Sequence, residues 1–439
     1  MNAPMSQLQV IASQAVSASQ SAAGAGQSAA SLSCRFCSAP LSKSFVDLGM
    51  SPLCQTHITA EQLNSKENFY PLHAYVCEQC FLVQLGEYVA PDEIFTDYHY
   101  FSSYSDSWLR HCQTYCQHMA ADFGITNGKK VIELASNDGY LLQYFVQQGV
   151  SVLGIEPADN VAQVARAKGV PTDSVFLGEA TARDTVARWG QADLVLGNNV
   201  LAHVPDLNDF VKGMSVLLGD DGLLTMEFPH LLELMQHNQF DTIYHEHFSY
   251  FSFTTVEKVF AAHGLRLFDV QTLPTHGGSI RIYGCHASSN KYPMNSRVAA
   301  MKQREAQFGI NQLSTYSSFA QQVIQTKRNL LDVLINLKRQ GKSIVGYGAP
   351  GKGNTLLNYC GIRSDFLDFT VDRNPYKQGK YTPGTHIPIY APERIKEVKP
   401  DYLFLLPWNL RHEIIEQHSY IRTWGGKFIV PIPKVELLP

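Results

Sequence analysis

The chain has 439 residues, with 35 lysine and arginine residues against 39 aspartate and glutamate residues. This length exceeds one hydrophobic core and predicts two or three domains, and the near balance of charge excludes the basic surface that nucleic-acid binding needs. No uncharged apolar run approaches the ~20 residues of a membrane span, so we expect no membrane segment.

The first 33 residues consist mainly of Ala, Ser, Gln and Gly and contain no aromatic or charged side chain. A secretory signal would need a basic start and a denser apolar core. We therefore predict a disordered tail over residues 1–33 and a cytoplasmic protein. In that compartment the nine cysteines should be thiols or metal ligands rather than disulfides.

Two Cys-x2-Cys pairs open the ordered part of the chain: Cys34 with Cys37, and Cys77 with Cys80. Four thiolates suit a tetrahedral zinc ion, and four protein ligands leave no open position for chemistry. Residues 69–76 alternate as a strand does and lead into the second pair. We predict a structural zinc site, with two unrelated pairs of reduced thiols as the alternative.

An aromatic and hydroxyl-rich segment, YHYFSSYS, follows at residues 98–105. Aromatic side chains at this density are compatible with a plain core. The polar residues between them favour a strap over a cleft, with a phenol able to reach a ligand.

A strand, a small polar turn and a helix are predicted over residues 129–148, and a second strand over residues 151–157 ends in Glu156. An acid at that position is placed to hold a ribose diol. The turn lacks the glycine spacing of pyrophosphate binders and is acidic, which suits a cationic nucleoside such as S-adenosylmethionine. A Rossmann domain without catalytic function is the alternative.

The candidate cofactor-binding residues follow the ends of these strands and of the next one, where open α/β sheets bind ligands. They are Glu133, Asn137, Asp138, Gly139, Glu156, Asn198 and Asn199, with His203 close behind.

Residues 241–252 (DTIYHEHFSYFS) gather two histidines, a glutamate and two tyrosines. The spacing is not the His-Glu-x-x-His of a helical metal site. In an extended strand Tyr244 shares one face with Glu246, and His245 shares the other with His247. The cluster suits proton abstraction from carbon by a histidine, or alternatively forms a buried polar contact between two domains.

Residues 273–281 (LPTHGGSIR) carry two glycines that permit close backbone approach to a ligand, and Arg281 could meet a phosphate. A plain turn before an edge strand is the alternative. Residues 298–340 then predict amphipathic helices that bridge two domains.

A second strand, glycine-rich loop and helix are predicted from residue 342. Gly348 lies in this loop, Lys352 adds positive charge, and amides at such a helix start suit phosphate. Asp372 ends the following strand, where a ribose-binding acid would lie. Taken alone, the pattern predicts a dinucleotide-dependent oxidoreductase.

From residue 34 onward the chain resembles the three-domain nucleotide-sugar C-3 methyltransferases that make branched deoxysugars. The matching motifs, as they stand here, are CRFC…CEQC, YHYFSSYS, VIELASNDGYLL, GIEP, NNVLAHVPD, YHEHFSYFS, LPTHGGSIR and VGYGAPGKGNTLLNYCGI. Eight motifs in one order make the resemblance specific.

The resemblance implies methyl transfer from S-adenosylmethionine to C-3 of a nucleoside-diphosphate 4-keto-6-deoxysugar. The C-4 ketone acidifies the C-3 proton, a base removes it, and the enolate carbon attacks the sulfonium methyl. By this resemblance His247 is the base, with Glu246 and Tyr244 beside it and with Tyr98 and His203 lining the pocket. The strand geometry turns Glu246 away from His247, so a bend is needed to make them partners.

The resemblance also favours the diphosphate of a nucleotide-sugar over a dinucleotide in the last domain. The candidate substrate-binding residues are Arg281, Gly348, Lys352 and Asp372.

The sequence therefore predicts an α/β protein with a small zinc-binding module (34–120), a class I methyltransferase Rossmann domain (121–285) and a second Rossmann-like domain (286–439). The leading hypothesis is a sugar C-methyltransferase that uses S-adenosylmethionine and a structural zinc ion and binds neither nucleic acid nor membranes. The rivals are an oxidoreductase that uses the glycine-rich loop and a non-catalytic zinc-ribbon adaptor. The identity of the sugar, its nucleotide and the oligomeric state stay open.

Overall fold

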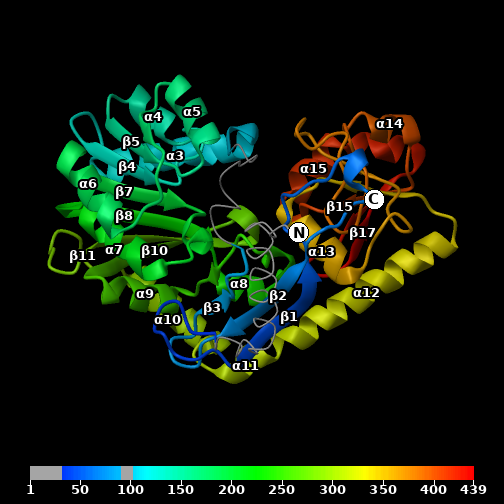
Figure 1. The fold of residues 1–439 in the computed structure, drawn as a ribbon, viewed down its shortest axis with the longest axis horizontal. Helices are drawn as coiled ribbons and strands as arrows, with labels where there is room; N and C mark the ends of the chain where they lie inside the picture. Colours follow the sequence, from blue (N-terminus) through cyan, green and yellow to red (C-terminus); the bar gives the residue numbers. More distant parts are fainter. Residues whose placement is uncertain (1–31, 90–101) are drawn as a thin grey trace, which may run out of the picture.

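The structure of the chain is a computed structural model that describes residues 32–89 and 102–439. The predicted tail up to residue 31, Tyr98 and the first part of the predicted strap lie outside the described residues. Three sheets form two lobes that are joined at their base (Figure 1). None of the described helices combines the length and the hydrophobicity that crossing a bilayer demands.

The central lobe is built on a seven-stranded sheet of order β10-β11-β8-β7-β4-β5-β6. Its strands are β4 (Lys130–Leu134), β5 (Ser151–Ile155), β6 (Thr172–Asp173), β7 (Ala192–Asn198), β8 (Leu218–Pro229), β10 (Leu265–Leu273) and β11 (Ser279–His286). The strands from β6 to β8 run parallel, whereas β11 runs antiparallel between β8 and β10. The motif at residues 273–281 therefore leads into an interior strand and not into an edge strand.

Helices cover both faces of this sheet, as a mainly parallel sheet requires. Side chains from α3 (Asp106–Phe123), α4 (Leu142–Gln147) and α5 (Asp159–Ala167) share one buried core, and those from α6 (Glu179–Trp189), α7 (Leu207–Leu217), α9 (Phe253–Ala262) and α10 (Ser296–Phe308) share the other. We expected the first module to run to residue 120. Instead, α3 buries Cys112, Tyr115 and Met119 in the central core, because it packs against β8 and β11: Tyr115 Oη lies 2.6 Å from Thr225 Oγ1, and Phe123 stacks on Tyr283.

The C-terminal lobe contains a six-stranded sheet of order β14-β13-β12-β15-β16-β17. Its elements are β12 (Ile344–Tyr347), α13 (Gly351–Cys360), β13 (Thr370–Val371), β14 (Ile389–Tyr390), α14 (Arg394–Val398), β15 (Tyr402–Leu405), α15 (Arg411–Gln417), β16 (Lys427–Val430) and β17 (Glu436–Leu438). All its strand pairs are parallel except β16 with β17. The predicted α/β class, with a second Rossmann-like unit, is confirmed.

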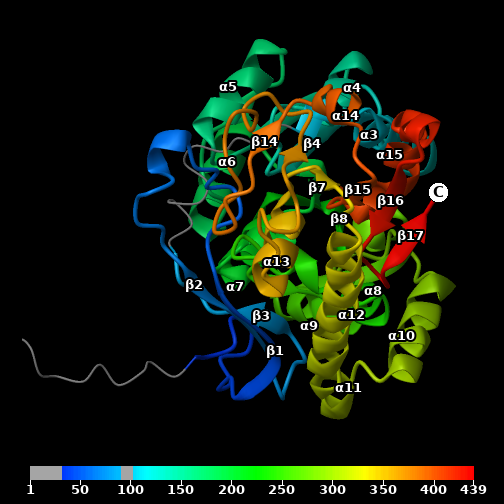
Figure 2. The same ribbon diagram turned by 90° about the vertical axis from the view of Figure 1, so that its right-hand side faces the viewer.

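Helices bridge the lobes as predicted: α10, α11 (Leu313–Ser317) and the long α12 (Phe319–Arg339). The yellow α12 spans the base of the molecule from the N-terminal sheet to the C-terminal lobe (Figure 1 and Figure 2). It buries Val323, Leu330, Leu334 and Leu337 along one stripe, the pattern of an amphipathic helix.

The N-terminal module forms a four-stranded antiparallel sheet of order β1-β2-β3-β9. Its strands are β1 (Lys43–Ser51), β2 (Tyr70–Val76), β3 (Val83–Leu85) and β9 (Ser249–Tyr250). The last strand comes from the histidine-rich stretch of the central part of the chain. The stretch therefore joins the N-terminal sheet to the central lobe, with α8 (Leu231–Gln236) preceding it.

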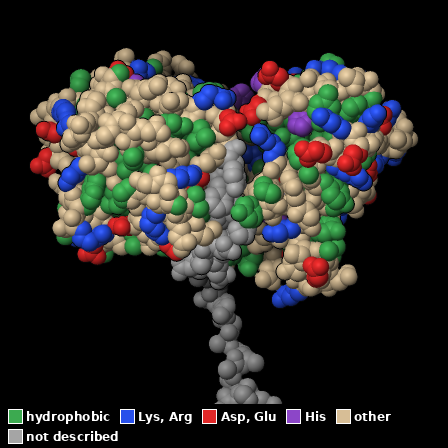
Figure 3. Space-filling view, turned by 90° about the horizontal axis from the view of Figure 1, so that it is seen from above, with side chains coloured by type: hydrophobic (Ala, Val, Ile, Leu, Met, Phe, Trp, Pro, Cys, Tyr) green, Lys and Arg blue, Asp and Glu red, His purple; other side chains and the backbone are tan. Residues whose placement is uncertain are grey.

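The two lobes face each other across a groove. Figure 3 looks onto this groove from above and shows Lys and Arg side chains on both of its sides. The strands β4, β5 and β7 of one lobe and β12 of the other end toward it, so their following loops supply its walls.

Candidate functional site

The four cysteines of the two Cys-x2-Cys pairs converge at the end of the N-terminal module. The Sγ atoms of Cys34 and Cys80 lie 3.5 Å apart, those of Cys37 and Cys77 lie 3.5 Å apart, and all four lie within 4.8 Å of one another. Tetrahedral zinc with Zn–S bonds of about 2.3 Å requires sulfur atoms about 3.8 Å apart. The four thiols fit zinc and supply a complete ligand set, so the ion stabilises the fold and does no chemistry.

The groove contains a cavity of about 630 Å³. Its walls come from all three parts of the chain. Gln55 belongs to the N-terminal module, Asn137, Glu156 and His247 to the central part, and Lys352 to the C-terminal lobe. One continuous cavity therefore connects the loops of the two Rossmann-like units.

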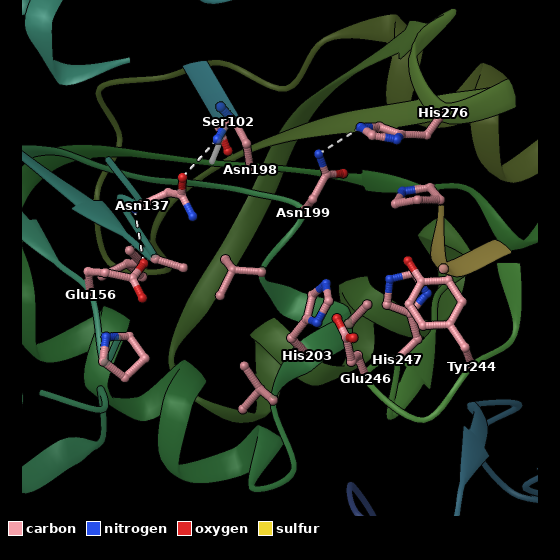
Figure 4. Close-up of a pocket in the computed structure, with 18 of the residues that line it drawn as sticks. Ser102, Asn137, Glu156, Asn198, Asn199, His203, Tyr244, Glu246, His247 and His276 are labelled. Carbon is pink, nitrogen blue, oxygen red and sulfur yellow. Dashed lines mark hydrogen bonds between the residues drawn. The ribbon is translucent and has the colours of Figure 1, made fainter. Parts of the chain in front are cut away.

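The cofactor end of the cavity is formed by the loops after β4 and β5. Asn137 adopts φ 47° in the turn after β4, and its backbone N–H donates to Glu156 Oε2 at 3.0 Å. The N–H of Ala158 donates to Glu156 Oε1 at 2.9 Å, and the side chain of Asn137 accepts from the N–H of Ser102 at 2.9 Å (Figure 4). Burial raises the pKa of Glu156 to about 7.

This end fits S-adenosylmethionine. The Glu156 carboxyl ends β5, where an acid can accept the two hydroxyl hydrogens of a ribose. Phe176 lines the cavity, and 48% of its surface is exposed, so its ring can pack against the adenine ring of S-adenosylmethionine. Asn199 also lines the cavity, and its buried Oδ1 accepts no hydrogen bond within residues 32–89 and 102–439.

Not every predicted cofactor residue reaches the cavity. Asn137, Glu156, Asn198 and Asn199 line it. The lining lacks the other three, Glu133, Asp138 and Gly139.

These three residues are buried in β4 and in the turn after it, where they support the loop that lines the cavity. Glu133 is fully buried in β4, and Asp138 pairs with Lys168 at 2.9 Å. Gly139 has φ 75°, and a Cβ there would lie 3.0 Å from Val170 Cγ2. Their buried positions follow from the close packing of the turn against the neighbouring helix and strand.

The opposite end of the cavity is lined by the histidine-rich stretch, residues 241–252. The stretch is not extended at residues 244–247, since the N–H of His247 donates to the carbonyl oxygen of Tyr244 at 2.9 Å and closes a tight turn. The turn brings the rings of Tyr244 and His247 to a centroid distance of 4.0 Å. It sends His245 away, with its Nε2 3.2 Å from the carbonyl oxygen of Pro71. The face pairing expected for a strand is therefore wrong.

His247 is oriented by the backbone and not by Glu246. Its Nδ1 lies 2.8 Å from the carbonyl oxygen of Thr242, which can only accept, so Nδ1 carries the proton and Nε2 is the free acceptor. The ring of His203 lies edge-on at a centroid distance of 4.7 Å (Figure 4). Burial and the neighbouring His203 hold the pKa of His247 well below its usual range, so its imidazole is neutral at pH 7.

Glu246 and His203 complete this end. Glu246 accepts a hydrogen bond from the thiol of Cys54 at 3.2 Å, so the N-terminal module contacts the turn directly. Burial lowers the pKa of His203 to about 4. The predicted set Tyr244, Glu246, His247 and His203 thus comes together at one end of the cavity, whereas Tyr98 lies outside the described residues.

His276 is a site residue to which the sequence assigned no role. It adopts φ 54° within the LPTHGGSIR motif, lines the cavity, and accepts a hydrogen bond at Nε2 from Asn199 Nδ2 at 2.9 Å. Burial lowers its pKa to about 4. The glycines that follow it, Gly277 and Gly278, were the signal of a close backbone approach, but they did not indicate which side chain would enter the cavity.

The C-terminal lobe contributes the start of α13. Lys352 lines the cavity, its Nζ donates to Asn409 Oδ1 at 3.1 Å, and it lies 4.9 Å from the ring centroid of Trp408. Trp408 Nε1 donates to Asp241 Oδ2 at 2.6 Å, and burial raises the pKa of Asp241 to about 6. Lys377 lines the same wall. Lys377 Nζ lies 3.8 Å from Asp372 Oδ2 and donates to the carbonyl oxygen of Ala349 at 2.8 Å, and burial lowers the pKa of Lys352. Two lysines therefore line the cavity from this lobe, and one of them already pairs with a carboxylate.

The other two predicted residues of this lobe do not line the cavity. Gly348 has φ 84°, and a Cβ there would lie 2.7 Å from Pro407 Cδ. Asp372 accepts the N–H groups of Ala349 and Asn374 at 2.8 Å each. Both residues shape the loop before α13, and the position of Asp372 does not suit the expected contact with a ribose.

Arg281 does not line the cavity either. Its guanidinium forms a buried ion pair with Glu227 and lies 4.5 Å from the ring centroid of Tyr115. Glu227 also lies 2.8 Å from His111 Nε2. This position does not suit the expected contact with a substrate phosphate, because the positive charge is already compensated inside the sheet.

Three family models match consecutive parts of the chain. The model "Putative zinc binding domain" matches residues 34–95, "Methyltransferase domain" matches 108–270, and "C-methyltransferase C-terminal domain" matches 274–433. The chain is 37% identical to the C-methyltransferase NovU of Streptomyces niveus over 405 residues, which cover 92% of this chain and 96% of NovU. It is 29% identical to the ubiquinone biosynthesis O-methyltransferase of Bordetella avium over 101 residues, 23% of this chain and 42% of that protein.

Solved structures of methyltransferases resemble part of the chain. The magnesium protoporphyrin IX methyltransferase ChlM of Synechocystis PCC 6803, with bound SAH, is 14% identical and has a TM-score of 0.33 over 40% of this chain and 83% of its own. An S-adenosylmethionine-dependent methyltransferase of Listeria monocytogenes is 14% identical with a TM-score of 0.32, over 40% of this chain and 99% of its own. Both likenesses are weak and add nothing to the assignment.

Proposed function

The chain belongs to the family of C-methyltransferases, and from this premise we propose that it methylates C-3 of a nucleoside-diphosphate 4-keto-6-deoxysugar through an enolate. It is an S-adenosylmethionine-dependent C-methyltransferase with a zinc-binding N-terminal domain. Forming a carbon–carbon bond requires a carbon nucleophile, and a ketone makes the neighbouring carbon acidic enough to supply one.

The observation that carries the proposal is the single cavity of about 630 Å³, with Glu156 and Asn137 at one end and His247 at the other. When bound, S-adenosylmethionine supplies an electrophilic methyl group on a sulfonium. A cavity that holds both ligands brings the methyl group and the sugar carbon together and excludes water between them.

His247 is the base in this proposal. Its Nδ1–H donates to the carbonyl oxygen of Thr242 at 2.8 Å, which fixes the ring and leaves Nε2 to accept the proton from the carbon next to the ketone. Because the pKa of His247 is lowered, the imidazole is already in the neutral form that a base requires. The electron pair of the broken C–H bond moves into the enolate and would then form the new bond to the methyl carbon, whose bond to sulfur would break and leave its electron pair on the sulfur.

The enolate oxygen needs hydrogen-bond donors. Tyr244 lines the same end of the cavity as His247, and its phenol can donate to the oxygen on which charge develops. His203 is neutral and can donate through one ring nitrogen. These groups would hold the ketone oxygen while His247 acts on the neighbouring carbon.

The nucleoside diphosphate fits the C-terminal wall. Lys352 lies in the first turn of α13, where free backbone N–H groups favour an anion, and Lys377, which pairs with Asp372 at 3.8 Å, lines the same wall. The dinucleotide-dependent oxidoreductase that the glycine-rich loop alone predicted receives no support, since the family models and NovU are all methyltransferases.

The test is incubation of the protein with S-adenosylmethionine and a panel of 4-keto-6-deoxy nucleotide-sugars that differ in sugar and nucleotide. We expect the mass gain of one added methyl group and a new carbon–carbon bond in two-dimensional NMR spectra. The C-4 ketone acidifies C-5 as well as C-3, so the NMR position decides the site of methylation. A methyl group found on oxygen or nitrogen, or turnover of sugars without the ketone, would contradict the proposal.

A further inference from the structure

We propose that the zinc knuckle, residues 34–37, sets the position of the catalytic histidines, with Arg35 and Gln84 as positioning residues. The inference rests on the proposed function, because it takes His247 as the base. It goes beyond a zinc ion that only stabilises its own module, because the knuckle packs directly against both chain segments that carry the histidines.

Arg35 reaches out of the knuckle between the two segments. Its Nη1 donates to the carbonyl oxygen of Pro205 at 2.8 Å, two residues after His203. Its Nη2 donates to the carbonyl oxygen of Leu85 at 2.6 Å, and the guanidinium lies 5.4 Å from the ring centroid of Phe248, the residue after His247. A rigid planar group that makes these contacts at once fixes the distance between them, which a flexible lysine cannot do.

Gln84 connects the zinc ligands to the strand that follows His247. Its Nε2 donates to Cys34 Sγ at 3.2 Å, and its Oε1 accepts the N–H of Arg35 at 2.9 Å. Its backbone pairs with Ser249 in the β3–β9 ladder, and its side chain is buried. Groups that hydrogen-bond to metal ligands orient them. Gln84 makes such a bond to Cys34 and also pairs through its backbone with β9, the strand that follows His247.

One backbone hydrogen bond then joins β3 to the segment of His247, and a second joins that segment to the segment of His203. The N–H of Leu85 donates to the carbonyl oxygen of Phe248 at 3.0 Å, and the N–H of Phe248 donates to the carbonyl oxygen of Ala202 at 2.7 Å. The knuckle itself is held on the first turn of α7, where Asn208 Nδ2 donates to the carbonyl oxygen of Phe36 at 3.0 Å. A shift of the knuckle therefore moves His203 and His247 relative to the cavity.

The test compares the full-length, zinc-loaded protein with Arg35→Ala and Arg35→Lys variants. A misplacement of about 1 Å lowers a rate on the order of a hundredfold, so we expect a fall in kcat of that size in both variants. Zinc content and the affinity for S-adenosylmethionine should stay at wild-type values, because the cysteines and Glu156 are untouched. The matched control is Lys43→Ala, which removes an exposed cation of the same module that pairs only with Glu78 among the described residues, at 3.9 Å.

A second readout needs no substrate. In protein labelled with 15N in the histidine rings, the Nδ1–H of His247 should give a signal protected from exchange by its bond to Thr242. We expect this signal to broaden or shift in Arg35→Ala and in Asn208→Ala, but not in Lys43→Ala. If no sugar is turned over, the proposed function fails. The NMR signal of His247 still tests whether the zinc knuckle positions this histidine, because it needs no substrate.

The inference is overturned by a zinc-loaded Arg35→Ala protein with the wild-type kcat and an unchanged His247 signal. It is also overturned if kcat falls only in proportion to lost zinc, since the knuckle would then act on folding alone. Gln84→Glu provides an independent check. It removes the donor to Cys34 and should change the His247 signal even where zinc is added in excess.

Discussion

Replacing His247 by asparagine distinguishes the loss of the catalytic base from a disruption of the surrounding turn. The asparagine side-chain amide can donate to the carbonyl oxygen of Thr242 in place of Nδ1–H, which now makes that bond at 2.8 Å. The variant lacks the basic Nε2. We therefore expect the turn at residues 244–247 to persist while proton abstraction stops.

The expected loss follows from the role of a general base. Such a group contributes about 10²–10⁴-fold to the rate, which corresponds to about 3–5 kcal/mol of activation free energy at 1.36 kcal/mol per tenfold change. Stability should change by no more than about 1 kcal/mol, because a neutral hydrogen bond is exchanged for another one. The loss should therefore appear in kcat and not in the amount of folded protein.

Two assays distinguish the base from other roles. The first measures methyl transfer under saturating S-adenosylmethionine. The second measures exchange of the sugar hydrogen next to the ketone with solvent deuterium in the absence of the donor, which reports proton abstraction alone. Both rates should fall together in His247→Asn, while calorimetry shows unchanged binding of S-adenosylmethionine.

The matched control is His245→Asn, which alters the same turn at a residue whose Nε2 contacts the carbonyl oxygen of Pro71 and does not line the cavity. It should keep wild-type methyl transfer. Near wild-type turnover or deuterium exchange in His247→Asn would refute the reasoning and assign the base to another group.

Three further predictions follow from the buried groups of the central lobe. Because the pKa of His247 is held below that of an ordinary histidine, kcat/KM for the sugar should stay flat between pH 8 and pH 6 when S-adenosylmethionine is saturating, so that Glu156, with a pKa of about 7, does not contribute; a base with a pKa of about 6.5 would lose about fourfold, and a pH-rate profile decides. Glu156→Gln should weaken S-adenosylmethionine binding about tenfold or more in calorimetric titration above pH 8, where Glu156, with a pKa of about 7, is ionised and hydrogen bonds to a charged acceptor contribute about 1.5–3 kcal/mol; equal affinity would remove Glu156 from the ribose site. Glu227→Gln leaves Arg281 buried without its counter-charge and should lower the free energy of unfolding by about 3–5 kcal/mol in urea titrations, whereas an unchanged midpoint would mean that the pair contributes nothing.

The zinc site could be anticipated because its ligands come from two short loops. A Cys-x2-Cys loop places its two thiols together without help from distant residues, so the spacing at Cys34 and Cys77 already indicated the ligands. The position of Glu156 at the cavity could be predicted for a similar reason, since an acid that follows a parallel strand lies at the ligand-binding edge of the sheet, whereas its contact with a ribose stays a prediction. Asn198 and Asn199 followed from the same rule.

Arg281 shows where this reasoning stops. The sequence presents a cation after two glycines, which suggests an exposed phosphate-binding loop. The pairing of β11 with β8 places Arg281 directly opposite Glu227, 54 positions earlier in the chain, and the two charges compensate each other inside the lobe. The register of an antiparallel pair depends on the whole sheet, so no local pattern could reveal this partner.

The sequence by itself determined the elements whose signals are local: the zinc ligands, the alternation of strands and helices in two Rossmann-like units, and the polar residues at their strand ends. Only the tertiary structure decided that the histidine-rich stretch turns sharply, donates β9 to the N-terminal sheet, and places His247 against a backbone carbonyl rather than Glu246. The physical reason is the separation along the chain between the residues that determine each feature. Periodicity and ligand spacing are set by neighbours along the chain, whereas turns, strand register and side-chain partners are set by packing between segments far apart in sequence.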